Sequence, residues 1–378
     1  MTEKELQELK RQFKWENDKF YLSRVGVAYA KISFDGREIQ SMEIKDFSLL
    51  SEEEGELYLA AFKKALSGTM GKNLVEYEFS APVDGEHAAQ HRLYAFREDQ
   101  LKSEDQFREL CEDIINKGQY TDNVCILAAA CEYSVPLKTK NDEDTMEEAG
   151  KYRFVLVSVH PASLTRIGLV YDRPSNSVQR KINDDMQIET APLDAFLYPC
   201  FTDRGADVNH VLYHCKNEKS FNADFVQSFL QCENQVSSLD QKDRFRQVLQ
   251  GMFDNRLKAE TILNLHNNIT DDLQENAEET GMLTYSKGQV RELLEASGAD
   301  EESLSHFSSV YSLVMDDRDI AAVNMTDKSR IVFKTPSINL SVKNDGASQV
   351  SLKLVDGKKY LMIAVDDDVE IDGLSVSL

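Results

Sequence analysis

The chain has 378 residues, of which 41% are hydrophobic, and it carries 43 basic against 66 acidic residues, a net charge of −23. This length and composition predict a folded protein with room for two domains. The negative charge repels phosphate backbones, so it excludes a protein that coats nucleic acid broadly and leaves such contact to a local basic face. A solvated acidic surface is the simplest interpretation of this charge, and attraction of a basic partner is the alternative.

The start of the chain and its cysteines indicate a compartment. The first six residues are Met-Thr-Glu-Lys-Glu-Leu, too charged for a secretory signal, and no apolar run approaches the roughly 18 residues of a membrane span. The 6 cysteines form no Cys-x-x-Cys pair, and Cys125 and Cys131 lie in an apolar run, where free cysteine behaves as a small hydrophobe. We therefore expect a reduced, cytoplasmic protein without a membrane segment.

In chain order, the first third of the sequence alternates helices and strands. Three capping patterns begin predicted helices over 2–13, 51–68 and 103–115, namely Thr2-x-x-Glu5, Ser51-x-x-Glu54 and Ser103-x-x-Gln106. Alternating apolar residues predict four strands, over 23–34, 37–44, 74–79 and 91–96. The turn Asp35-Gly36 joins the first two as a hairpin.

Two nearly continuous apolar runs, Val124–Cys131 and Phe154–Val159, mark the core of the first domain. Strands without a polar face are covered on both sides, so we expect both to be central in a sheet that is flanked by helices. Between them, 141–149 is predicted to be an acidic loop. Further on, 167–171 and 177–182 are expected to form a hairpin around Pro174-Ser175-Asn176.

After residue 215 the apolar period changes from two to that of a helix. Helices are predicted over 221–230, 239–253, 257–274, 286–296 and 300–315. From Arg330 the period of two returns, with Asp356-Gly357 as a type I′ turn and strands over 331–333, 338–342, 350–354 and 360–365. The sequence thus predicts an α+β fold in three parts: a mixed sheet flanked by helices (1–215), a helical segment (216–318), and a small antiparallel β tail that packs on the helices (319–378).

Two motif-like stretches are better explained as structure than as sites. Ser67-Gly-Thr-Met-Gly-Lys-Asn73 resembles the end of a phosphate-binding loop, but Leu66 and Asn73 replace its first glycine and its hydroxyl residue, and the stretch follows a helix. His210-x-x-x-His214 lacks the further ligands that zinc requires. We therefore expect no nucleotide, metal or cofactor.

One candidate site lies where the two halves of the chain meet. Asp203, Arg204, Asp207 and His210 stand among aromatic residues there. They suit either an acid–base pocket or a structural ion pair in which the arginine binds a carboxylate with two hydrogen bonds. The chain has no Gly-x-Ser-x-Gly elbow and no cysteine in the setting of a nucleophile, so no catalytic residue is assigned.

A second candidate site is basic. Arg166, Arg173, Arg180 and Lys181 are accompanied by a single acidic residue, Asp172, within 164–181. Four cations near a hairpin suit contact with phosphate groups. They equally suit pairing with the acidic residues of the protein itself.

Three patterns carry a resemblance to a known family. They are Phe-x-x-Pro-x-Phe-x-Asp-Arg-x-x-Asp at 196–207, Leu-Ser-Gly-Thr-Met-Gly-Lys-Asn-Leu at 66–74, and Asp240-Gln241-Lys242. In these the chain resembles an uncharacterised bacterial family, domain of unknown function 4317, which is found mainly in Gram-positive Firmicutes. The resemblance spans nearly the whole chain and implies neither an activity nor site residues.

A more distant similarity lies in the order of the elements. The run Ala223-Asp224-Phe225-Val226-x-x-Phe229-Leu230, the helical hairpin at 286–315 and the closing strands are similar to the bacterial nucleoid-associated protein family. Gln231-Cys232 departs from the glycine and small residue expected there. The similarity implies association with the nucleoid or with proteins that act on DNA, and it assigns no catalytic residues.

We therefore expect a non-enzymatic cytoplasmic protein, located at the nucleoid, that acts through DNA or a DNA-bound protein. The candidate contacts are Arg166, Arg173, Arg180 and Lys181. One alternative is an enzyme of unrecognised type with a pocket around Asp203, Arg204, Asp207 and His210. The other is an oligomeric protein with a regulatory or structural role, which exposed apolar area on the helical half would favour.

Overall fold

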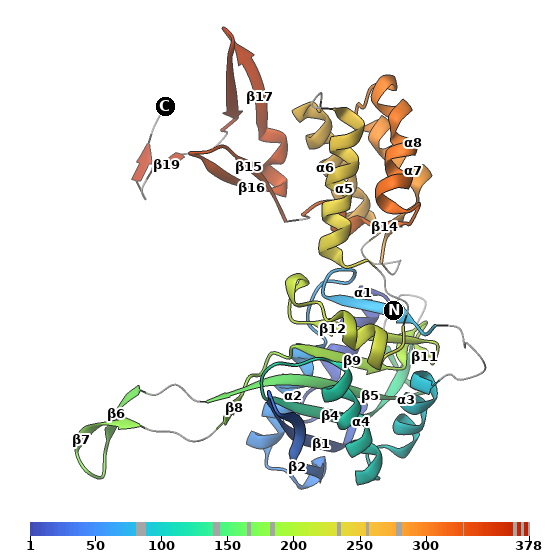
Figure 1. Ribbon diagram of the computed structural model, residues 1–378, viewed down its shortest axis with the longest axis vertical. Coiled ribbons are helices and arrows are strands. Elements are labelled where there is room, and N and C mark those ends of the chain that lie inside the picture. The colour runs from blue at the N-terminus through green and yellow to red at the C-terminus, as the bar shows by residue number, and fades with distance from the viewer. Residues whose placement is uncertain are drawn as a thin grey trace. The chain divides into compact units, whose positions relative to one another are not determined.

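The computed structural model describes residues 1–80, 88–138, 144–164, 168–181, 186–232, 236–254, 257–276, 282–327, 329–365, 369–371 and 374–376. Contacts between Cα atoms divide the chain into two compact units, Met1–Ser237 (unit 1) and Ser238–Leu378 (unit 2) (Figure 1). The predicted α+β fold class is confirmed: a large sheet with helices fills the first half, helices follow, and small β-hairpins end the chain.

Unit 1 is built on one sheet in which every described strand pair is antiparallel. From edge to edge the strands are β2 (Gly36–Asp46), β1 (Phe20–Ser33), β4 (Val124–Lys138), β5 (Asp144–Leu164), β9 (Asp194–Tyr198), β12 (His210–Cys215) and β3 (Leu74–Glu78). The short β8 (Met186–Ile188) pairs with the end of β5. β4 and β5 lie in the interior of this order, as their apolar sequences predicted.

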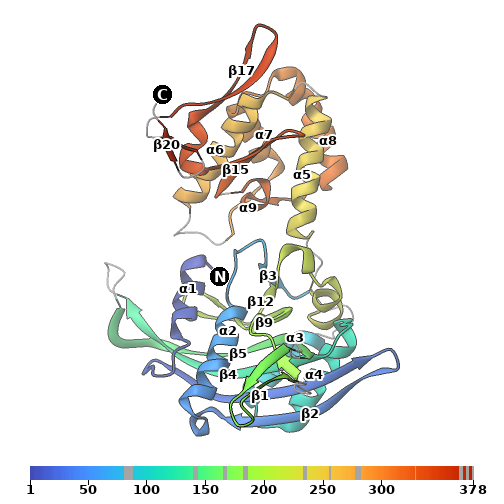
Figure 2. The ribbon, with the colours of Figure 1, turned by 90° about the vertical axis from the view of Figure 1, so that its left-hand side faces the viewer.

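Helices cover both faces of the sheet (Figures 1 and 2). The first face packs against α1 (Glu3–Gln12) and α2 (Glu52–Ala65). The second packs against α3 (Ala88–Asp99), α4 (Glu104–Lys117) and a π-helical turn, η3 (Phe225–Phe229). Successive residues of a strand point to opposite faces of the sheet, so alternate residues of each apolar run pack against the helices on the first and on the second face.

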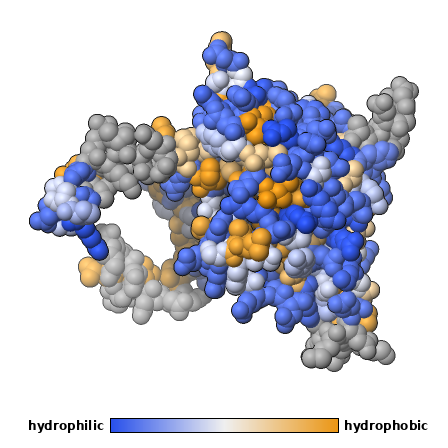
Figure 3. All heavy atoms as spheres, turned by 90° about the horizontal axis from the view of Figure 1, so that it is seen from below, coloured by the Kyte–Doolittle hydropathy of each residue, from blue (hydrophilic) through white to orange (hydrophobic). Residues whose placement is uncertain are grey.

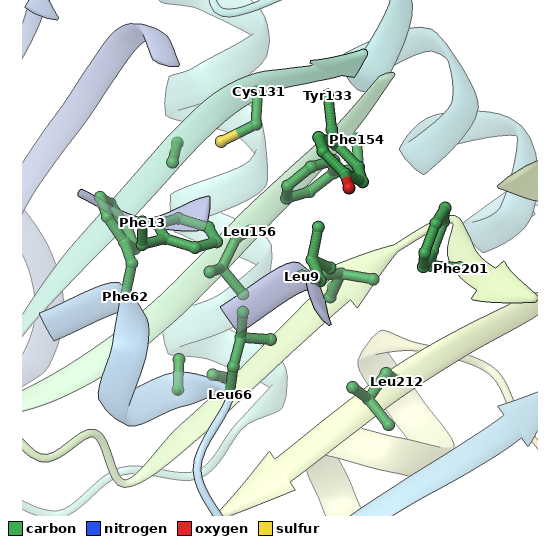
Figure 4. Close-up of a cluster of buried hydrophobic side chains, with 14 of the residues drawn as sticks. Leu9, Phe13, Phe62, Leu66, Cys131, Tyr133, Phe154, Leu156, Phe201 and Leu212 are labelled. Atoms are coloured by element: carbon green, nitrogen blue, oxygen red, sulfur yellow. The ribbon is translucent and has the colours of Figure 1, made fainter. Parts of the chain in front are cut away.

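The core on the first face shows this alternation in detail. Phe154 and Leu156 of β5 belong to it, whereas Val155 and Val157 belong to the core on the second face. In Figure 4, labelled side chains of both helices and of the strands gather in one cluster that includes Leu9, Phe13, Phe62, Leu66, Phe154, Leu156 and Leu212.

The predicted helix starts of unit 1 are confirmed by their caps. Thr2 Oγ1 accepts a hydrogen bond from the Glu5 amide at 3.1 Å, and the Glu5 carboxylate accepts one from the Thr2 amide at 2.7 Å. Ser51 and Ser103 each accept from the amide three residues further on, at 3.2 and 3.3 Å. These bonds satisfy amides that a helix leaves free in its first turn, which is why the capping patterns located the helices.

Unit 1 also contains smaller elements. The predicted hairpin around Pro174 is confirmed as β6 (Gly168–Asp172) and β7 (Ser177–Lys181). A second hairpin consists of β10 (Cys200–Thr202) and β11 (Gly205–Asp207). Two 3₁₀ turns complete the unit, η1 (Phe47–Leu49) and η2 (Glu218–Ser220).

Two predicted elements of this half are wrong, and a third is shorter than predicted. The strand expected over 91–96 lies in α3, because Leu93 and Phe96 are spaced for one face of a helix and are buried together. The acidic loop expected over 141–149 is a strand from Asp144 onward, held by pairing with β4; residues 141–143 lie outside the described ranges. The helix expected over 221–230 is present in a shorter form, because residues 223 and 224 are α-helical and continue directly into the π-helical turn η3.

Unit 2 begins with helices that share one apolar core. They are α5 (Ser238–Phe253), α6 (Ala259–Glu275), α7 (Lys287–Ala296), α8 (Glu301–Met315) and α9 (Ala322–Met325), with the short pair β13 (Thr284–Tyr285) and β14 (Ile320–Ala321). Among the described residues, no helix is long and apolar enough to cross a membrane.

Three antiparallel hairpins end unit 2, each paired within itself among the described strands. They are β15 (Arg330–Lys334) with β16 (Asn339–Lys343), β17 (Val350–Val355) with β18 (Lys358–Ile363), and β19 (Val369–Ile371) with β20 (Leu374–Val376). The 3₁₀ segment η4 (Asn344–Gln349) joins the first two. Its Asn344 accepts a hydrogen bond from His266 of α6 at 2.5 Å, so the hairpins are attached to the helices at this point.

Candidate functional site

The four residues of the predicted pocket lie on or beside one small hairpin of unit 1. Asp203 and Arg204 form the two-residue turn between β10 and β11, and both have left-handed backbones, with φ of 50° and 59°. Asp207 ends β11, and His210 begins β12. The structure brings Asp207 and His210 together and directs Arg204 elsewhere.

Arg204 bonds to α1 and β4 rather than to the neighbouring aspartates. Its guanidinium donates to Glu8 Oε2 and to the Pro136 carbonyl, both at 2.7 Å. Its backbone amide donates to Glu5 Oε1 at 3.3 Å. Because its guanidinium bonds to both a carboxylate and a carbonyl, Arg204 holds the β10–β11 turn against α1, which is a structural role.

Asp207 and His210 form a close pair, with 2.7 Å between Asp207 Oδ2 and His210 Nδ1. The other oxygen of Asp207 accepts from the Asn209 amide at 3.0 Å. Strand pairing adds a third group: β3 lies beside β12, and Glu76 is directly opposite Leu212. One ligand atom each from Glu76, Asp207 and His210 lies within 4.8 Å of the others, and all three residues are half-buried.

This trio, which we call the Glu76 cluster, offers one nitrogen and two carboxylate ligands. Such a set suits a divalent cation such as Zn²⁺ or Mn²⁺, and three protein ligands leave open coordination positions. The cluster is also satisfied without a metal, because Glu76 Oε2 accepts from the amino group of Met1 at 2.6 Å. Sequence analysis missed Glu76, since nothing in the sequence places β3 beside β12.

Cys200 lies close to the Glu76 cluster but is not a nucleophile. Burial raises the pKa of its thiol well above the usual value, and the nearby carboxylates of Glu76 and Asp207 act in the same direction. A nucleophilic cysteine needs a stabilised thiolate, and this environment stabilises the protonated form.

The sheet contains a buried serine–histidine pair that sequence analysis did not single out. His160 Nε2 lies 2.8 Å from Ser158 Oγ, and His160 Nδ1 lies 2.8 Å from the Glu189 carbonyl. Burial lowers the pKa of His160 to about 4, and likewise that of His214. The signal in the sequence is that Ser158 interrupts an otherwise apolar run.

Asp194 on the next strand does not complete a catalytic triad with this pair, because it faces the second face of the sheet. There its carboxylate accepts from Tyr120 Oη at 2.8 Å, Tyr213 Oη at 2.6 Å and Asn222 Nδ2 at 3.0 Å. Burial raises the pKa of Asp194 to about 6, against the opposite effect of these three hydrogen bonds. The carboxylate therefore links β9, β12 and the segments beside α4 and η3, which is a structural role.

The basic site predicted from the sequence corresponds to the β6–β7 hairpin. Arg173 is exposed in its turn, Arg180 and Lys181 are residues of β7, and Arg166 lies outside the described residues. Asp172, its one acidic residue, accepts a hydrogen bond from the Ser175 amide at 3.0 Å and so shapes the turn.

None of the described side chains of the β6–β7 hairpin belongs to either core of unit 1. Among the described strands, β6 and β7 pair only with each other. Their described apolar side chains are exposed, namely Leu169 by 79%, Tyr171 and Val178. Figure 3 shows one face of the molecule, on which hydrophilic residues prevail and hydrophobic residues form small separate patches. A hairpin that contributes nothing to a core is available for contact with another molecule.

A family model described as a domain of unknown function (DUF4317) matches residues 1–374, and so extends over both units. No curated protein and no solved structure matches the chain. The match assigns no activity and no site residue, so the function has to be argued from the geometry.

Proposed function

We propose that this chain, which belongs to the family described as domain of unknown function 4317, is a non-enzymatic binding protein that contacts DNA, or a protein bound to DNA, through the β6–β7 hairpin. The observation that carries the proposal is the hairpin itself: its sequence has three basic residues and one acidic residue, which shapes the turn, and none of its described side chains belongs to a core. The resemblance to nucleoid-associated proteins that we inferred from the sequence led to the same proposal.

The net charge of −23 restricts how such contact is made. Charges on the rest of the protein repel a phosphate backbone, but salt screens them beyond about 8 Å at physiological ionic strength. Cations on a separate hairpin therefore act on a nearby phosphate with little interference from distant acidic groups. A cationic hairpin lets an acidic protein contact DNA at one place, while the remaining surface still repels the phosphate backbone.

The shape of the hairpin suits a duplex. A two-stranded antiparallel ribbon fits the major groove of DNA, where cations at its turn and along its strands meet phosphate groups. In β6–β7 the register pairs Leu169 with Arg180, and Tyr171 with Val178. Apolar and aromatic side chains beside the cations add contact to sugars and bases once the phosphates are engaged.

The test is binding of a fluorescent 30-base-pair duplex to a variant with reversed charges, Arg173→Glu, Arg180→Glu and Lys181→Glu. We expect the affinity to fall at least tenfold. A matched control reverses three exposed cations elsewhere in unit 1, Lys31→Glu, Lys102→Glu and Arg108→Glu. Both variants change the net charge equally, so equal losses, or no binding by the unchanged protein at low salt, would contradict direct contact through the hairpin.

A second candidate function, metal-assisted catalysis, is favoured by the Glu76 cluster, whose ligand atoms lie within 4.8 Å of one another. Its test is titration of the full chain with Zn²⁺ and Mn²⁺ by calorimetry. A metal centre predicts binding that His210→Ala weakens at least tenfold, while His306→Ala, an exposed histidine of α8, leaves it unchanged. Equal binding by both variants would reject this candidate.

A further inference from the structure

Unit 2 contains a groove with an apolar floor. Its cavity has a volume of about 450 Å³ and lies between α5, α6, the residues after α9, and β15. The floor consists of Phe245, Leu249, Leu265 and Ile269, which are almost fully buried. We call this site the α5–α6 groove.

Cations stand on two sides of the α5–α6 groove. Lys242 and Arg246 belong to α5, and Arg330 belongs to β15. Arg246 and Arg330 are each 60% exposed at the side chain, with partners Asp243 at 3.1 Å and Asp327 at 3.6 Å. Such exposed pairs are weak and exchange readily for another anion.

The groove is basic although the protein is acidic, because its lining has the cations Lys242, Arg246 and Arg330 against one carboxylate, Asp327. Residues 330–363, which include β15, carry six basic and two acidic residues, a net charge of +4, whereas the whole chain carries −23. Within the hairpin, Arg330 lies directly opposite Lys343, an arrangement of like charges that is unfavourable by itself. Asp327, 3.6 Å from Arg330, offsets part of this repulsion, and a further anion at this end of β15 would offset more of it.

The groove is too open for a small ligand. Sites for small molecules bury about 70–90% of the ligand surface. Here Val332, which lines the groove, is 51% exposed, and both arginines extend into solvent. A duplex fits no better, because its backbone would meet the cations and leave the apolar floor empty. A peptide helix laid along an open groove fills the floor with one face and stays solvated on the other.

We propose that the α5–α6 groove binds an acidic amphipathic helix of a partner protein. Apolar residues of that helix, spaced by three and four, enter the floor between α5 and α6. Acidic residues on the two sides of this apolar stripe meet Lys242 and Arg246 on one side and Arg330 on the other. The site is separate from the β6–β7 hairpin, and the inference does not depend on the proposed function.

The test is selection from a displayed library of random 16-residue peptides against the full chain. The inference predicts enrichment of peptides that combine aspartate or glutamate with apolar residues spaced by three and four. Selected peptides are then synthesised with a fluorophore, and their affinities are measured at low and physiological salt. Enrichment of neutral or basic peptides, or no enrichment, would overturn the inference.

Variants locate the binding in the groove. Arg246→Glu with Arg330→Glu should weaken the selected peptides at least tenfold, and Val332→Ala by a few-fold. Lys258→Glu with Arg291→Glu reverses two exposed cations outside the groove and should leave the affinity unchanged. Far-UV circular dichroism checks that each variant is folded.

Two further outcomes would assign the groove to another occupant. Displacement of the peptide by decanoate at micromolar concentration would identify a site for a small amphiphile. A dimer in light scattering that Arg246→Glu with Arg330→Glu dissociates would identify a second copy of the chain. Either result would overturn the inference of a partner helix.

Discussion

Two hairpins of the protein, β4–β5 and β17–β18, have similarly apolar sequences and very different surroundings. Every residue from Val124 to Cys131 in β4 is buried, whereas every residue of β18 is exposed. In β17–β18 the apolar pair Leu352 and Leu361 is directly cross-strand, yet both side chains remain in solvent. The continuous apolar run of β4 and the alternating pattern of β17 both predict a strand, and the covering layers decide whether the strand joins a core.

This difference in burial separates apolar residues that stabilise the fold from apolar residues that are exposed and can contact another molecule. Layers of helices cover β4–β5 on both faces, so its side chains stabilise unit 1. In β17–β18 only Val350 is buried. Exposed apolar residues that support no core are a feature of interaction surfaces. In unit 2, Val332 of β15 is exposed by 51% and lines the basic α5–α6 groove.

The largest expected loss of stability comes from truncating a buried side chain of the β4–β5 hairpin. Leu156→Ala removes a side chain that is 1% exposed and should lower the free energy of unfolding of unit 1 by about 2–5 kcal/mol. Leu354→Ala makes the same change at a site that is 70% exposed and should cost less than about 0.5 kcal/mol.

Urea unfolding measures both effects. Trp15, the one tryptophan of the chain, reports unit 1 by its fluorescence, and circular dichroism reports the whole chain. Similar losses for the two leucine variants would contradict the contrast between the hairpins.

A slightly smaller effect is expected where polar contacts inside unit 1 are broken. Asp194→Ala leaves two tyrosine hydroxyls without their acceptor and removes one of the two acceptors of the Asn222 side-chain amide, and it should destabilise unit 1 by about 2–3 kcal/mol. Asp122→Ala, at an exposed aspartate, is the control and should change little. An Asp194→Ala protein as stable as the control would show that the buried carboxylate is not a structural link.

Acidification should weaken unit 1 through its buried histidines. His160 and His214 have pKa values of about 4 in the folded state, below the ordinary 6.5, so the unfolded chain binds more protons between these values. The contribution of each histidine to the free energy of unfolding is fully present above pH 6.5. As the pH falls towards 4, each contribution decreases by about 3 kcal/mol.

Asp194 opposes this trend. Its pKa of about 6 lies above the ordinary 3.8, so the folded state binds more protons between these values and gains about 3 kcal/mol as the pH falls. The net loss of stability is therefore about 3 kcal/mol, and the loss should be steeper in Asp194→Ala. Urea unfolding at several pH values checks the slope, and a stability that rises on acidification would contradict the account.

The smallest expected effect concerns a helix cap. Ser51→Ala removes the acceptor of the Glu54 amide at the start of α2 and should cost about 1 kcal/mol. Ser48→Ala, at an exposed serine of η1, serves as the control. A midpoint of unfolding that shifts equally in both variants would show that the cap contributes nothing.

The sequence located elements whose signal is local. Capping patterns such as Thr2-x-x-Glu5, the apolar runs of β4 and β5, and the turn Asp356-Gly357 each depend on neighbouring residues, and the structure contains all of them. Asp356 and Gly357 both have positive φ, as a type I′ turn requires. The wrong prediction over 91–96 arose because a short apolar run fits either period.

The candidate sites depend on residues that are distant in the chain, and these the sequence could not assemble. Glu76 joins Asp207 and His210 only because β3 pairs with β12. Arg204 binds Glu8 nearly 200 residues away, instead of the aspartates beside it in the sequence. The α5–α6 groove combines Arg246 with Arg330 in the same way. The cationic hairpin was predictable because its residues are contiguous.

The most direct test of the central claim, that a local cationic hairpin lets this acidic protein contact DNA, is the salt dependence of duplex binding. For three phosphate contacts, from Arg173, Arg180 and Lys181, the logarithm of the affinity should fall with the logarithm of salt concentration with a slope of roughly −3. The charge-reversed hairpin should show a slope near zero. No binding at low salt, or a slope that is the same in both proteins, would contradict the claim.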